Sequence, residues 1–183
     1  MSNKALKEYQ DILKNYQYFI TIDPGARKGG GTGVAVFNLP ICKTGKICDP
    51  SPIETYQLES KAALWLQKVD DIADQLFHII KGTKGQGRGQ TLFFIERPKF
   101  FESFKGHTAA TSDSLFKLCF ITGRFYGVIR SFNLKCILLP INDWKGQLNK
   151  KQVSTRIHRI CGKNWPKDQD DAVGMGLYLK GLF

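Results

Sequence analysis

The chain has 183 residues and a mass of 20.7 kDa, a length that suits one domain whose core needs no disulfides or metals to hold it. Hydrophobic residues make up 42% of the sequence and aromatic residues 12%, which argues against disorder driven by low hydrophobicity. Lys and Arg number 27 against 16 Asp and Glu, a formal net charge of +11. A polyanionic partner is therefore expected, either nucleic acid or an anionic membrane surface.

Targeting signals and cysteine pairs are not expected from this sequence. No apolar run approaches the ~20 residues that a membrane span requires, and the first residues are charged throughout, unlike a signal peptide. The five cysteines are scattered, and only Cys42 and Cys48 lie close, at a spacing that zinc knuckles do not use. Reduced thiols and a cytoplasmic location are therefore predicted.

Secondary-structure patterns divide the chain into five strands and several helices. An amphipathic helix is expected over 4–16, a buried strand over 18–23 and a second strand over 32–38, which pairs with the first as an antiparallel hairpin. The remaining elements are, in chain order, a strand over 53–58, a helix over 61–81 with Ser60 as its N-cap, a strand over 91–96, a helix over 109–132, a strand over 135–139, and helical segments over 142–160 and from 168 to the C-terminus.

This order of elements predicts the class of the fold. A hairpin-rich first half followed by βαβα units implies an α/β domain with a mixed five-stranded sheet and helices on both faces. Residues 18–183 are expected to form this domain, with residues 1–17 as an N-terminal arm or short helix.

Two of the buried strands end on a carboxylate. Asp23 closes the first strand before Pro24, and Glu96 closes the fourth before Arg97 and Pro98. An acid in an apolar run costs several kcal/mol unless it is paired or bound to a metal. Asp23 alone is explained equally well as a turn residue before Pro-Gly. Two acids at the ends of two central strands instead indicate a site.

A third group of acids opens the last helix. Asp168 and Asp171 are three residues apart, so they share one face of its first turn. Taken alone, they are best explained by helix capping, with Asp168 as N-cap and Asp171 at the third helical position. The helix continues with small and apolar residues, however, which places its acidic turn at the sheet edge where the strand-end acids converge. Asp170 is then expected to face solvent or a basic neighbour.

Converging carboxylates predict a metal-dependent chemistry. Several carboxylates in one place repel each other unless divalent cations neutralise them, and oxygen ligands with substrate phosphates suit Mg²⁺ or Mn²⁺. Two such ions about 4 Å apart would activate a water and stabilise the leaving oxygen of a phosphodiester. An acidic centre in a basic chain therefore indicates a nuclease.

Four short segments give the sequence a resemblance to a known family. They are Ile22–Gly25, Thr32–Ala35, Phe94–Glu96 and Asp168–Ala172. In order and spacing they resemble the RuvC-type Holliday junction resolvases of the retroviral-integrase and RNase H fold superfamily. The resemblance implies an RNase H-like fold with two Mg²⁺ or Mn²⁺ ions in each active site. It implies one set of catalytic and metal-binding residues, namely Asp23, Glu96, Asp168 and Asp171.

The same resemblance implies an activity. It predicts a structure-selective endodeoxyribonuclease that acts in DNA recombination and repair as a homodimer and resolves four-way and other branched DNA, leaving 5′-phosphate and 3′-hydroxyl ends. A long turn after Asp23 and a long loop at 39–52 favour a phage-like or divergent member, in a prokaryotic or phage-infected cell. Two alternatives stay open, an RNase H-like nuclease acting on hybrids or flaps and a non-catalytic junction-binding protein.

Basic and aromatic residues near the acids are candidates for DNA contacts. They are Arg27, Lys28, Lys99, Phe100, Phe101, Phe104, Lys105, Lys145, Lys150 and Lys151. Aromatic side chains beside cations suit base stacking and phosphate contact. Burial of two of the phenylalanines in the core, and an ordinary solvated helix face for the lysines, are the alternative interpretations.

Overall fold

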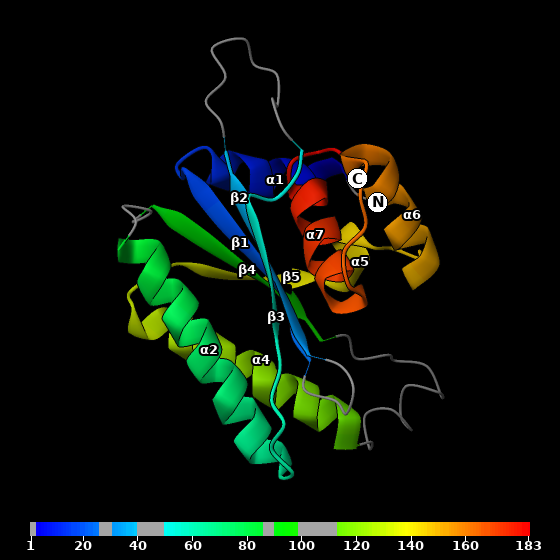
Figure 1. The fold of residues 1–183 in the computed structure, drawn as a ribbon. Coiled ribbons are helices and arrows are strands. Elements are labelled where there is room, and N and C mark those ends of the chain that lie inside the picture. The colour runs from blue at the N-terminus through cyan, green and yellow to red at the C-terminus, as the bar shows by residue number, and fades with distance from the viewer. Residues whose placement is uncertain (1–2, 26–30, 40–49, 86–89, 99–112) are drawn as a thin grey trace.

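A mixed five-stranded sheet forms the centre of the molecule, with helices on both of its faces (Figure 1). The structure is a computed structural model, and it describes residues 3–25, 31–39, 50–85, 90–98 and 113–183. The strands are β1 (Tyr18–Asp23), β2 (Thr32–Asn38), β3 (Glu54–Leu58), β4 (Thr91–Arg97) and β5 (Cys136–Pro140). The helices are α1 (Asn3–Leu13), α2 (Trp65–Gly85), α4 (Asp113–Ser131), α5 (Ile141–Trp144), α6 (Lys150–Cys161) and α7 (Lys167–Leu179).

Strand pairing brings the two strand-end acids to the same edge. The strand order is β3-β2-β1-β4-β5. The predicted hairpin is present, with β1 antiparallel to β2, whereas β4 lies parallel to β1 and pairs Ile95 with Ile22. Because the carboxyl ends of parallel strands meet at one edge, the residues that follow this pair, Asp23 and Glu96, leave the sheet side by side.

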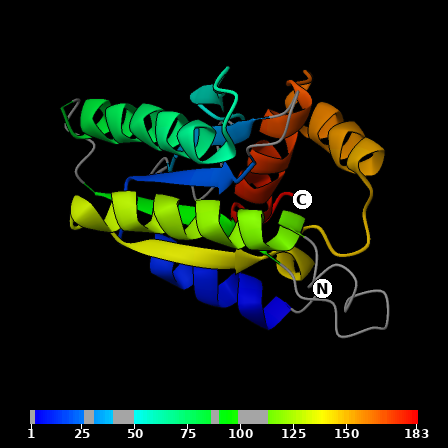
Figure 2. The same cartoon turned by 90° about the horizontal axis from the view of Figure 1, so that it is seen from below.

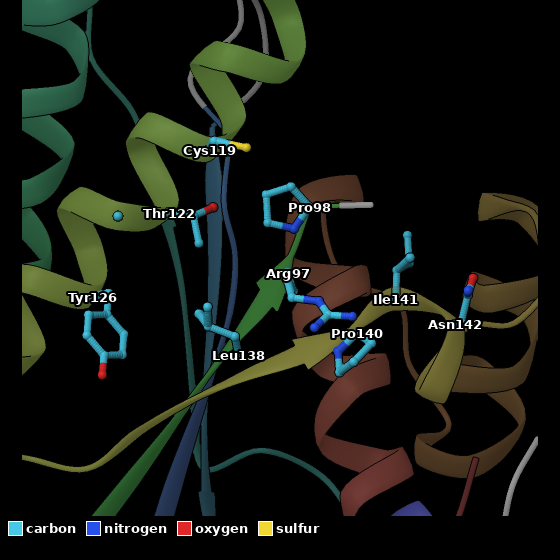
Figure 3. Close-up of a pocket in the computed structure, with 10 residues that line it drawn as sticks. Arg97, Pro98, Cys119, Thr122, Tyr126, Leu138, Pro140, Ile141 and Asn142 are labelled. Carbon is cyan, nitrogen blue, oxygen red and sulfur yellow. The ribbon is translucent and has the colours of Figure 1, made fainter. Parts of the chain in front are cut away.

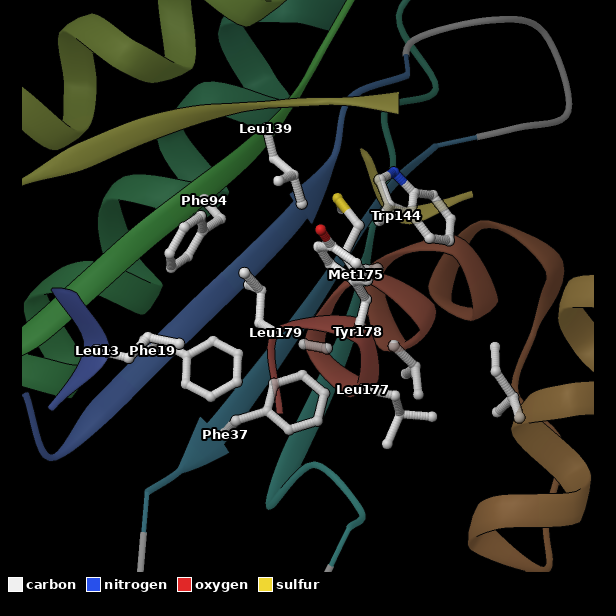
Figure 4. Close-up of a cluster of buried hydrophobic side chains, with 14 of the residues drawn as sticks. Leu13, Phe19, Phe37, Phe94, Leu139, Trp144, Met175, Leu177, Tyr178 and Leu179 are labelled. Atoms are coloured by element: carbon white, nitrogen blue, oxygen red, sulfur yellow. The ribbon is translucent and has the colours of Figure 1, made fainter. Parts of the chain in front are cut away.

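Apolar side chains form a separate core on each face of the sheet. One core joins alternate residues of β1 and β4 to α2 and α4, and the other joins the intervening residues to α1, α5, α6 and α7. Burial on both faces explains why the central strands are continuous apolar runs. Figure 4 shows the second core, in which the rings of Phe19 and Phe37 stack with centroids 4.9 Å apart. Figure 2 shows α6 beside α7 at one end of the sheet.

Helix α7 lies directly on β1 and β2. A Cβ atom at Gly176 would lie 2.0 Å from the ring of Phe37, and one at Gly33 would lie 1.8 Å from the carbonyl oxygen of Asp168. The buried hydroxyl of Thr21 donates to the carbonyl of Ala172 at 2.7 Å. These contacts fix the acidic start of α7 against the strand that carries Asp23.

The predicted N-terminal helix is present and packs against this second core. Leu13 is buried in the core, and the ring edge of Tyr9 meets the ring of Phe94 with centroids 6.0 Å apart. The Tyr9 hydroxyl donates to a carboxylate oxygen of Asp143 at 3.0 Å. Helix α1 is therefore joined to α5, the short helix beside the sheet edge. None of the described helices is both long and apolar enough to cross a bilayer.

Two predicted helix boundaries are wrong. Helix α2 begins at Trp65, and Ser60 caps a preceding turn instead, where its hydroxyl accepts from the Ala62 N–H at 3.1 Å. The segment expected to be helical over 142–160 contains two helices, because Gly146 adopts a left-handed φ of 58° between them. The second of these, α6, starts with a capping box in which Asn149 accepts from the N–H of Gln152.

Candidate active site

All four predicted acids line one cleft of about 720 Å³. Asp23 comes from the end of β1, Glu96 from the end of β4, and Asp168 and Asp171 from the first turns of α7. Basic side chains share the lining with them, namely Lys68, Lys117, Lys145 and Lys150. The cleft therefore combines groups that bind cations with groups that attract a polyanion.

The carboxylates in the cleft disfavour each other's ionisation. Burial raises the pKa of Glu96 to about 7, with a further contribution from the charge of Asp171, while Lys145 and Trp144 act in the opposite direction. The pKa of Asp23 is also raised well above its ordinary value, first by burial and then by Glu96 and Asp171. Both side chains keep a small exposed area, yet protein atoms surround them closely enough for desolvation to dominate.

Two ammonium groups face Asp171. The Lys145 Nζ lies 2.8 Å from its Oδ1, and the Lys150 Nζ lies 3.4 Å from its Oδ2. Asp171 and Lys145 are nearly buried, whereas the side chain of Lys150 is 50% exposed. Lys150 can thus reach a ligand in the cleft while it balances the acidic centre. Lys151 lines a neighbouring cavity of about 410 Å³, which shares Lys150 and Asp171 with the acidic cleft.

The capping interpretation of Asp168 is wrong. Pro166 occupies the N-cap position of α7, and its carbonyl accepts the N–H groups of Gln169 and Asp170 at 2.8 and 3.0 Å. Asp171 is therefore not at the third helical position. The Asp168 Oδ2 accepts instead from the backbone N–H of Gly31 and from the Gln57 Nε2, both at 2.9 Å. The carboxylate is held in the lining of the cleft by Gly31, which directly precedes β2, and by Gln57 of β3.

Asp170 is buried, contrary to the expectation that it faces solvent. It is 7% exposed, accepts from the backbone N–H of Trp165 at 3.3 Å, and is hydrogen-bonded by the side chain of Ser154. Lys150 is a basic neighbour, as expected, and its charge lowers the pKa of Asp170, although burial raises it overall. Asp170 therefore ties α7 to α6 and to the preceding loop.

Two hydrogen-bond donors to the acids carry no signal in the sequence. The indole N–H of Trp144 donates to the Oε2 of Glu96 at 3.0 Å, and Gln57 donates to Asp168. Trp144 has the pattern of an ordinary core residue, and Gln57 that of a residue in a half-exposed strand. Lys68 and Lys117 also carry no such signal, because they lie in α2 and α4 among charged residues of a kind that solvent normally covers.

The donor chemistry of the cleft fits a hard divalent cation. Carboxylate oxygens are the ligands that Mg²⁺ and Mn²⁺ prefer, and a cation would relieve the mutual repulsion of Asp23, Glu96 and Asp171. In the part of the chain that is described, no three such side chains come close enough together to form a coordination site. The ammonium groups of Lys145 and Lys150 balance the charge of Asp171 in this arrangement.

Several predicted DNA contacts cannot be placed. Those that lie outside the described residues are Arg27, Lys28, Lys99, Phe100, Phe101, Phe104 and Lys105. Of the predicted basic residues that are described, Lys145 and Lys150 line the cleft and Lys151 lies beside it.

A third cavity, of about 660 Å³, shares Ile141 with the acidic cleft (Figure 3). Its lining is mainly apolar, with Tyr126 and Leu138 on one side and Pro140 near the shared wall, and it includes no described carboxylate. Among the described residues it therefore offers no carboxylate to a cation, and the acidic cleft is the candidate active site.

Comparison with known proteins shows similarity in structure but no match in sequence. The sequence matches no protein-family profile and no curated protein. The structure of Thermus thermophilus RuvC superposes with a TM-score of 0.58 at 11% identity, covering 88% of this chain and 91% of that chain. The chain has the RuvC fold. A second structure, T. thermophilus RuvC in complex with Holliday junction substrate, has a TM-score of 0.55 at 12% identity over the same shares.

The RuvC fold accounts for how distant acids come together in this chain. The first strand, the fourth strand and the last helix meet at one edge of the sheet, and each carries a carboxylate there. The fold class predicted from the sequence, a mixed five-stranded sheet of the RNase H-like type, is confirmed.

Proposed function

We propose that the protein is a divalent-metal-dependent endonuclease that cuts branched DNA, above all four-way junctions. One observation carries this proposal: carboxylates from β1, β4 and α7 line a single cleft in a chain of net charge +11. This distribution of charge suits a polyanionic substrate, which the basic surfaces would bind and the acidic centre would hydrolyse.

Asp23, Glu96 and Asp171 are the residues that would hold Mg²⁺ or Mn²⁺, and Asp168, which lines the same cleft, would complete the set. When bound, two such ions would supply an activated water and stabilise the leaving oxygen of a phosphodiester. Gly31 and Gln57 hold Asp168 in place through its Oδ2.

The lysines of the cleft have a separate role in this proposal. Lys150, half exposed at 3.4 Å from Asp171, is placed to exchange its carboxylate partner for a phosphate of the substrate. Lys145 is nearly buried and forms an ion pair with Asp171 through a contact of 2.8 Å. Lys151 and the basic and aromatic residues after β1 and β4 would extend the contact to neighbouring phosphates and bases.

Branched DNA is proposed as substrate because of the shared fold. One of the RuvC structures that superpose on this chain is a complex with Holliday junction substrate. A two-fold homodimer of this chain would place two clefts on opposite strands of a two-fold symmetric junction. We further propose that residues 18–183 are the nuclease domain and residues 1–17 an N-terminal arm, in a phage-like or divergent member that acts in the cytoplasm of a prokaryotic or phage-infected cell.

A cleavage assay on defined substrates tests the proposal. A synthetic mobile four-way junction, a linear duplex of the same sequence and an RNA–DNA hybrid are each incubated with the protein in Mg²⁺ or in EDTA. We expect cutting of the junction alone, in Mg²⁺ alone. Preferred cutting of the hybrid would assign an RNase H-like activity instead, and junction binding without any cutting in Mg²⁺ or Mn²⁺ would assign a non-catalytic binding protein.

A further inference from the structure

Trp144 lies next to the acidic centre without belonging to it. It is the last residue of α5, its side chain is fully buried, and its indole N–H donates to the Oε2 of Glu96 at 3.0 Å. An indole nitrogen can only donate, and a donor–carboxylate bond is stronger than one between neutral groups. This bond therefore restricts how the Glu96 carboxylate can turn at the end of β4.

The indole ring is itself held from several sides. A Cβ atom at Gly174 would lie 2.8 Å from the Cζ3 of Trp144, so the ring lies directly on the backbone of α7. The ring of Phe183 lies beside it with centroids 5.9 Å apart, and the Lys145 Nζ is 5.3 Å from its centroid (Figure 4 shows the ring at the edge of the core). A ring packed in this way cannot follow a moving carboxylate, so it fixes the direction of the hydrogen bond.

The Trp144 side chain contacts both Glu96 of β4 and helix α7, which carries Asp171. Glu96 belongs to β4, whereas Gly174 lies on α7 three residues after Asp171. Lys145, the next residue after Trp144, pairs with Asp171 at 2.8 Å. Trp144 therefore forms a structural link between the Glu96 carboxylate of β4 and the Asp171 carboxylate of α7.

We propose that Trp144 is a positioning residue that holds the Glu96 carboxylate in the orientation required to bind a divalent cation together with Asp23 and Asp171. The inference rests on the proposed function, because it assigns Trp144 a role in that same site. The competing explanation is that Trp144 only fills the core and satisfies its N–H with the nearest acceptor, as buried tryptophans usually do.

Replacing the donor while keeping a ring tests the inference. Trp144→Phe retains an aromatic side chain and removes the N–H. We expect its affinity for Mn²⁺, measured by calorimetry on the protein without DNA, to fall by about 10-fold or more, the range typical of lost partners around metal ligands. The Mg²⁺ concentration that gives half-maximal cleavage should rise by the same factor, with junction binding in EDTA unchanged.

Trp165→Phe is the matched control. Trp165 donates its backbone N–H to Asp170, and its ring packs against the second core and lies under Lys163 at 4.8 Å, so the same substitution should leave both metal measurements unchanged. If Trp144→Phe does not fold, Gly174→Ala provides a second variant, because its methyl group displaces the ring without removing the donor. It should weaken Mn²⁺ binding in the same direction.

A nuclear magnetic resonance measurement checks the hydrogen bond between Trp144 and Glu96 on which the inference depends. The chain has three tryptophans, so three indole N–H signals are assigned by substitution. We expect Glu96→Ala and Mg²⁺ addition each to shift the Trp144 signal and leave that of Trp165 in place. Wild-type Mn²⁺ affinity in Trp144→Phe, or a Trp144 signal that ignores Glu96→Ala, would overturn the inference alone. A wild-type chain that binds no Mn²⁺ would overturn the proposed function as well.

Discussion

Removing one charge from the acidic cleft should stabilise the metal-free protein. The pKa of Glu96 is raised from 4.5 to about 7 by burial and by Asp171. Each pH unit of such a rise corresponds to about 1.4 kcal/mol, so ionised Glu96 destabilises the fold by roughly 3 kcal/mol above pH 7. Because the folded state binds this proton more tightly, the penalty is absent below pH 4.5 and grows as the pH rises to about 7.

The variant Glu96→Gln keeps the shape of the side chain and cannot ionise. We expect it to match wild type at pH 4.5 and to exceed its free energy of unfolding at pH 8 by about 1 to 3 kcal/mol. Urea denaturation in EDTA across this pH range measures the difference, with the exposed Glu8→Gln on α1 as a control that should show no such trend. Saturating Mg²⁺ should reverse the order. A Glu96→Gln variant that is less stable than wild type at pH 8 in EDTA would refute the reasoning.

Three further outcomes are expected. Asp23→Asn should cut junctions at less than a tenth of the wild-type rate at saturating Mg²⁺ and still bind them in EDTA, because it loses a ligand charge but keeps its shape; a faster rate contradicts its role. Asp170→Asn should keep cleavage within about twofold, because Asp170 does not line the acidic cleft, whereas Asp171→Asn should lose cleavage because Asp171 does; the opposite ranking would contradict this assignment of the site. Junction affinity should fall steeply with salt, and Lys150→Ala combined with Lys151→Ala should reduce the slope of log K against log salt by up to about 0.9 for each phosphate contact removed; an unchanged slope would show that neither lysine contacts phosphate.

The parts of the site that follow from the cost of burying charge could be predicted from the sequence. Asp23 and Glu96 stand out because each ends an apolar run, and parallel pairing of two such strands must bring their ends together. The mixed sheet follows from the tight hairpin and the later alternation of strands and helices. In each case the pattern within one segment carries the information.

The parts that depend on tertiary contacts could not be predicted. The carbonyl of Pro166 sets the start of α7. The spacing of the acids therefore could not show that Asp168 does not cap the helix or that Asp170 is buried. Trp144 and Gln57 reach their carboxylates from other elements, and no local pattern distinguishes them from core or strand residues. A side chain that donates to one of these carboxylates can come from any element that the fold places within hydrogen-bonding distance.

The contact between Gly33 and α7 has a consequence for how the active centre tolerates change. A single methyl group at position 33 would overlap the carbonyl oxygen of Asp168 at 1.8 Å, so any larger residue there must push the helix away from the sheet. Such a displacement carries Asp168 and Asp171 away from Asp23 while every acid stays in the sequence. The spacing between the two halves of the centre is thus encoded by an absent side chain on β2, at a position that a search confined to charged residues would pass over.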